Sequence, residues 1–408
     1  MKPIYFVCVL LCLATAFAAR PVHAQTETVL YSFTGGSDGG GPQSRLTSDG
    51  AGNFYGTTFE GGVGNFGVGY GTVFELSPNG SGGWNETVLY SFKGGEDGAN
   101  PSSPVIFDSA GNLYGTTGSG GIKGNGVVFE LSRAGKKWKE AVLHKFIGTD
   151  GANPAGGLIM DAAANLYGTT QNGPAGTAIV FELSRSGGTW TEQVIYTIDQ
   201  PLLVGLPNGL TMDAARNIFG STLFTVFELS PDGLGAWNPI VLHTFTGGLK
   251  DGAYARGTLV LDQAGNLYGT AAYGGAYGQQ IGGYGTVYKL SHGRKGWTEK
   301  ILYFFKGGPN DGYGPAAGIV FDQAGNIYGT TANGGEFNLG TVFELVTPVG
   351  KGSHKEKVLW SFNGPDGFFP FSSLMLDDAG DLYGTTIAGG STDQGGSSGN
   401  GVVFMVAP

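Results

Sequence analysis

The sequence predicts an all-β fold, a seven-bladed β-propeller of four-stranded antiparallel blades. A hexapeptide close to NLYGTT occurs seven times, successive copies begin 49 to 60 residues apart, and the same three short apolar segments surround each copy. Repeats of about 50 residues that each hold four short strands are the sequence signature of propeller blades. The copies begin at Asn53, Asn112, Asn165, Asn217, Asn266, Asn326 and Asp381.

The second repeat illustrates the four strands in order. An apolar stretch ending in Asp, residues 104–108 (PVIFD), predicts the first strand, and NLYGTT at 112–117 predicts the second. GVVFELS from residue 126 predicts the third strand, and VLHKF at 142–146 the fourth. All four are rich in Val, Ile, Phe, Tyr and Thr and end at Gly, Asn, Asp or Pro, which is typical of strands. No stretch sustains a helical period.

Local chemistry explains the turn and the glycine that recur in each repeat. The run from Asp108 to Asn112 predicts a tight turn, with Gly and Asn at positive φ and the Asp accepting local hydrogen bonds. Gly115 removes a side chain where backbones approach closely.

The ends of the chain predict how the ring closes. Residues 29–33 read as a fourth strand and residues 401–407 as a third strand, so the last blade lacks a fourth strand of its own. The N-terminal strand can supply it, which leaves no unpaired edge. An open solenoid would need distinct capping repeats, whereas the first and last repeats resemble the others. We expect residues 25–408 to form one propeller domain.

The first 24 residues predict a signal peptide. A cationic start at Lys2 precedes an apolar run over residues 4–19, and a small-residue cleavage site follows at Ala24. The alternative is an uncleaved membrane anchor, but this run is shorter than the roughly 20 residues that cross a bilayer. The sequence therefore predicts export to the periplasm or the extracellular space, without membrane insertion after cleavage.

Composition limits the partners. Both cysteines, Cys8 and Cys12, lie in the predicted leader, so the mature chain has no disulfide and no cysteine metal site. Without Lys2 and Arg20 the chain keeps 20 basic residues against 32 acidic ones, a net charge of −12. Such a charge repels nucleic acid and anionic membranes. We expect a monomer that binds no nucleic acid.

The paired motifs GNLYGTT and GTVFEL resemble those of the GloVer tandem-repeat family of exported bacterial proteins, also called choice-of-anchor repeat proteins. The resemblance covers essentially the whole mature chain. It implies export and a propeller-like repeat fold, and it brings no established activity. Members often carry a C-terminal sorting signal, whereas this chain stops at Val406-Ala407-Pro408 without an apolar tail or a basic cluster.

Catalytic residues are not predicted. Of the 32 acidic residues, 24 lie at positions that recur from repeat to repeat, and recurrence favours an architectural role. His144 and His243 replace a recurring Tyr, and no two histidines have metal-ligand spacing. The sequence predicts no catalytic residue and no metal ligand. The acidic residues outside the recurring positions are Glu60, Glu96, Asp199, Asp232, Glu336, Asp378, Asp381 and Asp393.

Binding residues are predicted on one face of the ring. Strand direction places the loops between second and third strands, and those leading from each fourth strand to the next repeat, on the same face. Variable loops on a rigid scaffold commonly carry binding sites. This face collects an Asp-Gly dipeptide from six repeats, which predicts either ordinary turns or acceptors for Ca²⁺ or sugar hydroxyls. These aspartates are Asp38, Asp97, Asp150, Asp251, Asp311 and Asp366.

Aromatic and apolar residues of the same loops complete the predicted site. Blade four lacks the Asp-Gly dipeptide, and its loop between second and third strands is reduced to Leu223-Phe224, which predicts a notch in the rim. The alternative is simple loop erosion. The predicted stacking surfaces are Tyr70, Tyr254, Tyr273, Tyr277, Tyr284 and Phe337, and the predicted notch residues are Leu202, Leu203 and Phe224.

These observations favour an exported, non-enzymatic binding module whose partner is a glycan or a surface protein. A polysaccharide lyase or hydrolase is the alternative, because propellers host such sites and fold alone does not decide function. No cofactor is expected, and calcium is the only ion that the aspartates suggest.

Overall fold

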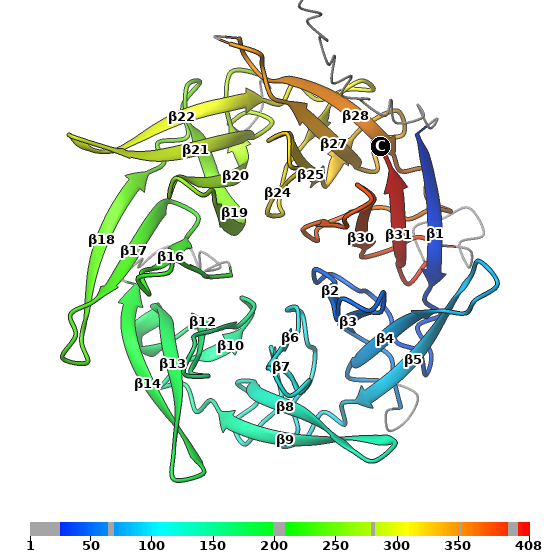
Figure 1. Ribbon diagram of the computed structural model, residues 1–408, viewed down its shortest axis with the longest axis vertical. Helices are drawn as coiled ribbons and strands as arrows, with labels where there is room; N and C mark the ends of the chain where they lie inside the picture. The colour runs from blue at the N-terminus through cyan, green and yellow to red at the C-terminus, as the bar shows by residue number, and fades with distance from the viewer. Residues whose placement is uncertain (1–24, 64–68, 199–208, 279–281, 351, 391–398) are drawn as a thin grey trace, which may run out of the picture.

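The computed structural model describes residues 25–63, 69–198, 209–278, 282–350, 352–390 and 399–408. These residues form seven antiparallel blades arranged in a ring around a central opening (Figure 1). The predicted seven-bladed propeller is therefore confirmed. Among the described residues the only helical segment is one 3-10 turn, Pro174–Gly176. The described part of the chain contains no helix that is long and apolar enough to span a membrane. The predicted signal peptide lies outside the described residues.

Each blade is described from its inner strand outward. Blade 1 is β2 (Thr47–Ser48), β3 (Phe54–Thr58), β4 (Thr72–Pro78) and β5 (Trp84–Ser91); blade 2 is β6 (Ile106–Phe107), β7 (Leu113–Thr117), β8 (Val127–Ala134) and β9 (Lys137–Lys145). Blade 3 is β10 (Ala152–Pro154) and β11 (Ile159–Met160), both paired with β12 (Leu166–Asn172), then β13 (Ala178–Ser186) and β14 (Thr189–Ile198); blade 4 is β15 (Thr211–Met212), β16 (Ile218–Ser221), β17 (Thr225–Pro231) and β18 (Trp237–Thr244).

The remaining blades follow the same order. Blade 5 is β19 (Gly252–Leu261), β20 (Leu267–Gly274), β21 (Thr286–Gly293) and β22 (Gly296–Phe304). Blade 6 is β24 (Val320–Phe321), β25 (Ile327–Thr331), β27 (Thr341–Val346) and β28 (Lys355–Ser361), with the short ladder of β23 (Gly312–Tyr313) and β26 (Asn333–Gly334) beside it. Blade 7 is β29 (Met375–Leu376), β30 (Leu382–Thr386), β31 (Val402–Ala407) and, from the other end of the chain, β1 (Thr26–Ser32).

The two ends of the chain close the ring. β1 pairs antiparallel with β31 from Thr26 opposite Ala407 to Ser32 opposite Val402, and the two strands lie side by side in Figure 1. The amide of Phe33 extends the pairing with a 3.0 Å hydrogen bond to the carbonyl of Gly401. The predicted closure by the N-terminal strand is therefore confirmed.

Strand lengths differ from the sequence expectation. Most inner strands have only two paired residues, and the fourth strands begin earlier than the VLYSF motif and include the glutamate that precedes it, as in β5. Every pair of third and fourth strands contains a bulge, because the second residue of the VLYSF motif, Leu89 in β5, has no partner opposite. A bulge re-aims the residues that follow it.

Apolar rings fill the space between neighbouring blades. Phe92, at the end of the fourth strand of blade 1, packs edge-to-face on Phe129 in the third strand of blade 2, with ring centroids 5.2 Å apart. Both side chains are fully buried. An aromatic pair recurs at the other seams, although at the seam of blades 3 and 4 Ile198 stands in the position of Phe92 and Tyr196 supplies the ring. Edge-to-face pairs stabilise beyond the area they bury. The further pairs are Phe33–Phe74, Phe146–Phe181, Tyr196–Phe227, Phe245–Tyr288, Phe305–Phe343 and Phe362–Phe404.

Candidate functional site

The predicted aspartates lie in the turns that lead from one blade to the next. Each carboxylate contacts the aromatic side chain near the end of the preceding fourth strand and accepts a backbone N–H at the start of its turn. Asp97, for example, accepts from the Tyr90 hydroxyl at 2.9 Å and from the Lys93 amide at 3.0 Å. The aromatic partners elsewhere are Tyr31 for Asp38, His144 for Asp150, His243 for Asp251, Tyr303 for Asp311 and Trp360 for Asp366. The structure thus ties each aspartate into its own turn.

A glutamate from the fourth strand of the next blade faces each of these aspartates. In all six glutamates the Oε1 atom is buried and has no hydrogen-bond partner. Burial first, and the nearby aspartate second, raises the pKa of each glutamic acid, to about 7 for Glu86 and to about 8 for Glu27. We call these the seam carboxyl pairs: Asp38–Glu86, Asp97–Glu140, Asp150–Glu192, Asp251–Glu299, Asp311–Glu356 and Asp366–Glu27.

At the seam between blades 3 and 4 the sequence departs at both positions of the pair. β14 is followed by Asp199-Gln200-Pro201 instead of an Asp-Gly turn, and Pro239 in β18 occupies the position of the glutamate. The two positions are far apart in the chain, and both depart from the repeat at this seam.

In most repeats the third residue after the aspartate joins two blades through its backbone, whereas in blade 5 the following residue, Ala255, donates to the carbonyl of Leu223 in blade 4. The amide of Asn100 donates to the carbonyl of Tyr70 in blade 1 at 2.8 Å, and its carbonyl accepts from the amide of Gly118 in blade 2 at 3.1 Å. This geometry requires a left-handed backbone, which Gly and Asn adopt at low cost. Four repeats place Gly or Asn there: Gly41, Asn100, Asn153 and Gly314.

Two repeats place a large aromatic residue in the same left-handed position. Tyr254 has φ 56° and Phe369 has φ 55°. The Tyr254 ring lies 5.6 Å from Phe224 and 5.4 Å from Tyr273, and the Phe369 ring lies 5.1 Å from Phe368 and 6.3 Å from Phe371 (centroid distances). Tyr273 and Phe369 are exposed. The structure thus brings three predicted residues, Tyr254, Tyr273 and Phe224, into one cluster.

The other predicted aromatic residues are spread around the same face. Tyr70 is half-buried against the core between blades 1 and 2. Tyr284 is half-buried and packs on Tyr313 at 5.3 Å, while the exposed ring of Tyr277 lies 5.8 Å from the Lys306 ammonium. Phe337 is half exposed. The predicted notch residues Leu202 and Leu203 lie outside the described residues.

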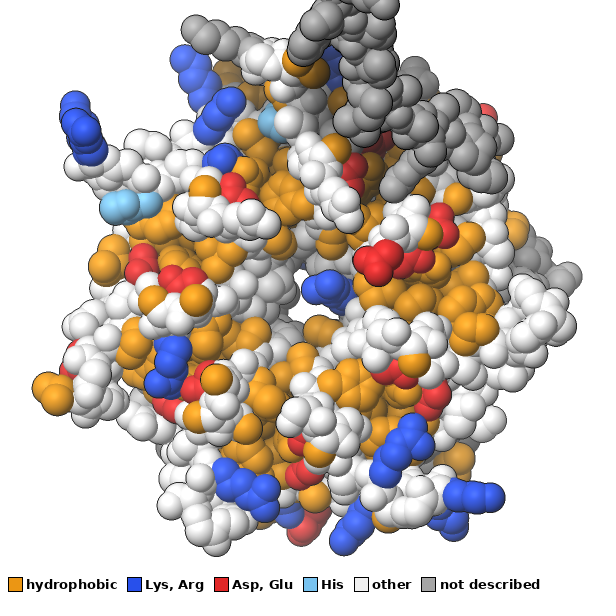
Figure 2. Space-filling model, in the orientation of Figure 1, with side chains coloured by type: hydrophobic (Ala, Val, Ile, Leu, Met, Phe, Trp, Pro, Cys, Tyr) orange, Lys and Arg blue, Asp and Glu red, His pale blue; other side chains and the backbone are white. Residues whose placement is uncertain are grey.

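Sequence reasoning missed part of this face. Phe369 and Phe371 carry no motif, but Phe369 occupies the column in which the other repeats have Gly, Asn or Tyr, and that departure was readable. Two arginines were also missed: Arg45 precedes the innermost strand of blade 1, and Arg256 lies in β19. Surrounding protein desolvates the Arg45 guanidinium and lowers its pKa. Figure 2 shows basic side-chain atoms inside the central opening.

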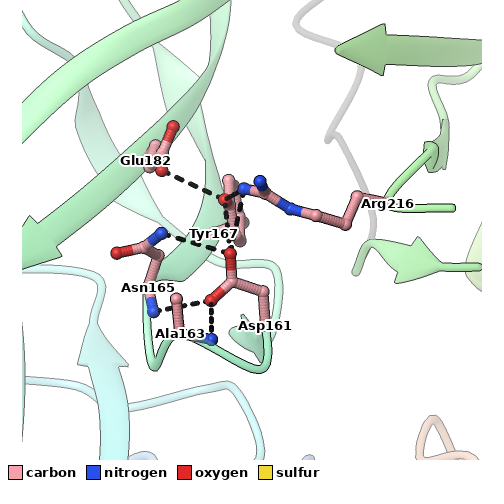
Figure 3. A network of polar contacts seen from close by, with 6 residues as sticks. All are labelled: Asp161, Ala163, Asn165, Tyr167, Glu182 and Arg216. Carbon is pink, nitrogen blue, oxygen red and sulfur yellow. Dashed lines mark hydrogen bonds and ion pairs between the residues drawn. The ribbon is translucent and has the colours of Figure 1, made fainter. Parts of the chain in front are cut away.

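Carboxylates on the opposite face are held in structural networks. In blade 3, Asp161 accepts from the amides of Ala163 and Asn165 and lies 2.9 Å from the Arg216 guanidinium of blade 4 (Figure 3). Tyr167 adds contacts of 3.1 Å to Asp161 and 3.0 Å to Glu182. The repeated aspartates of the other blades close the same turn without the arginine.

One open hollow of about 580 Å³ lies on blade 6, between the turn at Pro309 and the strand β28. Its lining is polar and includes Glu336, Glu356 and Lys357.

Comparisons with known proteins agree with the repeat pattern. The sequence profile described as the Gloeobacter/Verrucomicrobia repeat matches residues 13–225 and 209–408. No curated protein matches the chain in sequence.

Solved structures show the same fold at low sequence identity. A streptogramin B lyase is 12% identical, with 94% of this chain and 97% of that chain covered and a TM-score of 0.55. A catalytically inactive virginiamycin B lyase from Staphylococcus aureus, solved with quinupristin, is 11% identical, with 94% and 100% covered and a TM-score of 0.55. A protein from Lactobacillus plantarum is 15% identical, with 82% and 95% covered and a TM-score of 0.53.

Proposed function

The chain belongs to the Gloeobacter/Verrucomicrobia repeat family, and from that premise we propose that it is an exported, non-enzymatic binding module that holds a neutral glycan on its loop-rich face. Export is supported by the leader pattern of residues 1–24, which places the mature chain in the periplasm or outside the cell. N-terminal sequencing of the secreted chain tests that part, since it should begin at Gln25.

One observation carries the binding proposal: Tyr254 and Phe369 occupy a left-handed backbone position that four other repeats give to Gly or Asn. A left-handed conformation costs an L-residue about 1–2 kcal/mol. Strain of this kind concentrates at functional sites. Each strained residue also lies at the centre of an aromatic cluster. We therefore attribute the free-energy cost of the left-handed backbone to the positioning of these rings and not to the shape of the turn, which Gly or Asn would form at lower cost.

The chemistry of the clusters favours a sugar. Exposed aromatic rings offer flat apolar surfaces, and the C–H face of a pyranose ring is apolar as well. Ligand sites combine such surfaces with a few polar groups, and the exposed Tyr273 adds a hydroxyl. The net charge of −12 repels anionic polymers. A neutral glycan fits these constraints better than an acidic one.

The test uses residues that the chain itself accepts at this position. Tyr254→Asn and Phe369→Asn place in the turn the residue found at Asn100 and Asn153, so both variants should fold and melt no lower than the parent. We expect affinity for a glycan selected on an array of neutral glycans to fall at least about tenfold in the double variant. Asn153→Gly changes the same turn position without removing a ring and should bind normally.

Unchanged glycan affinity in the folded double variant would rule out these clusters as the site. Release of new reducing ends or unsaturated products from the bound glycan would instead support the enzymatic alternative, a polysaccharide lyase or hydrolase.

A further inference from the structure

The seam carboxyl pairs occur in two chemical forms. Four of them lie beside a Tyr or Trp, whose side chain contacts the aspartate: Tyr31, Tyr90, Tyr303 and Trp360. In the other two pairs an imidazole takes that place, His144 at the seam of blades 2 and 3 and His243 at the seam of blades 4 and 5. Tyr and Trp are not suited to bind a divalent cation beside two carboxylates, but imidazole is a common metal ligand.

Three potential ligand atoms meet at each imidazole. His243 Nε2 lies 3.3 Å from Asp251 Oδ1 and 3.6 Å from Glu299 Oε1. His144 Nε2 lies 3.0 Å from Asp150 Oδ2, and one oxygen of Glu192 completes that cluster within 4.8 Å. Tetrahedral zinc with bonds of about 2.0–2.2 Å holds its ligand atoms roughly 3.3 Å apart. The His243 cluster already has nearly this spacing.

The glutamates of these two clusters, like those of the other four seams, hold a buried oxygen that a ligand would satisfy. Glu192 Oε1 and Glu299 Oε1 are buried and accept no hydrogen bond. Each lies in a glutamate that faces the carboxylate of an aspartate. A buried polar atom without a partner costs about 1–3 kcal/mol. A cation bound between the histidine and the two carboxylates would satisfy that oxygen, and two carboxylates with a neutral imidazole match a divalent charge.

We propose that His144–Asp150–Glu192 and His243–Asp251–Glu299 are two inter-blade binding sites for a divalent transition metal of the zinc type, with water in the remaining position. Nitrogen in the ligand set favours zinc over calcium, which takes oxygen ligands. One site joins blade 2 to blade 3 and the other joins blade 4 to blade 5. The two sites flank the seam of blades 3 and 4, where Pro239 in β18 replaces the glutamate.

Zinc binding to the EDTA-treated mature chain tests this directly. In competition with a chromophoric chelator we expect two equivalents of Zn²⁺ per chain and a higher melting temperature with zinc than without. His144→Tyr and His243→Tyr restore the residue of the other seams, so both variants should fold. Each single variant should lose one equivalent, and the double variant should lose both.

The reverse substitution at another seam should add a zinc site. Tyr90→His places an imidazole beside Asp97 and Glu140 and should add a third equivalent of zinc. Zinc bound equally by the parent and the double His→Tyr variant, or by neither, would overturn the proposal, because the imidazoles would then serve only as hydrogen-bond partners of the aspartates. Preferential binding of Ca²⁺ by both proteins would overturn it too.

Discussion

At the scale of single residues, the repeated hexapeptide NLYGTT is a set of six separate contacts. In the second repeat Asn112 and Tyr114 bond to Asp108, and Leu113 is buried in the core. The first threonine of the motif reaches the next blade in several repeats, as when Thr57 donates to the carbonyl of Ser103 at 3.1 Å. The second, Thr117, accepts the amide of Val127.

The glycine of the motif makes room for the phenylalanine of the next strand. A Cβ on Gly115 would lie 2.6 Å from Cζ of Phe129, and the same clash would occur in every other repeat, with a Phe or with Tyr288. We predict that Gly115→Ala lowers the free energy of unfolding by about 1–3 kcal/mol, the usual cost of overpacking a core. Urea denaturation of the mature chain measures this.

The control for that substitution is Gly95→Ala. Its φ is not positive, and its nearest neighbour within 4 Å is the Asp97 carboxylate at 3.9 Å, so its stability should be nearly unchanged. Adding Phe129→Leu to Gly115→Ala should return part of the lost stability. If Gly115→Ala melted like the parent, the close approach of the Phe129 ring would not be the reason why this position requires glycine.

Sequence alone reached this scale in part. It predicted the turn role of Asp108, and at Gly115 it predicted a close approach of backbones, whereas the structure places the side chain of Phe129 there. The identity of the approaching group is a contact between strands, and spacing along the chain does not reveal it. The left-handed backbone of Tyr254 is likewise a three-dimensional property, although the departure from Gly or Asn in that column of the repeat is visible in the sequence.

At the scale of strands and turns, the seam carboxyl pairs link stability to pH. Glu86 faces Asp38 and lies near Tyr31, and burial raises its pKa from 4.5 to about 7. A folded-state pKa above the unfolded value means that the folded chain holds the proton more tightly. The stability that this proton provides is complete below pH 4.5 and is lost as pH rises through about 7.

We therefore predict that, in EDTA, the melting temperature falls between pH 5 and pH 9. Glu86→Gln keeps the shape of the side chain and a donor group but cannot ionise, so it should reduce that fall. Scanning calorimetry at several pH values measures both effects. A Lys136→Gln variant, which alters an exposed side chain in the turn between β8 and β9, serves as the control and should keep the parental slope. A parental melting temperature that did not change over this range would contradict protonated glutamates at the seams.

Strand order and type were predictable because each repeat shows the same pattern of apolar residues. The bulges and the short inner strands were not predictable, since they depend on how blades twist around the central opening. The seam pairs were hidden for another reason: Asp38 and Glu86 belong to different repeats, and only the ring brings them together. The sequence did show both residues recurring, and recurrence favoured an architectural use.

At the scale of the whole molecule, one pair of strands holds the ring shut. Without residues 25–33, β31 would lose one of its two neighbouring strands, keeping β30 alone, and the Phe33–Phe74 contact would disappear. Truncating a buried Phe costs about 3–5 kcal/mol, so we predict a melting temperature about 5–10 °C lower for the chain that begins at Thr34. Circular dichroism measures the change, and removal of Gln25 alone is the control. An unchanged melting curve would mean that blade 7 is stable with three strands.

The closure through β1 also has a consequence for the order of folding. β1 spans Thr26–Ser32 and its partner β31 spans Val402–Ala407. β1 therefore cannot pair until β31 has been synthesised. Contacts between such distant segments form slowly, because the entropy of closing so long a loop precedes any gain. During that interval the exposed edge of β31 fits the β1 strand of a second molecule equally well. At high concentration, refolding should therefore yield strand-exchanged dimers alongside closed rings, and dilution should favour the rings.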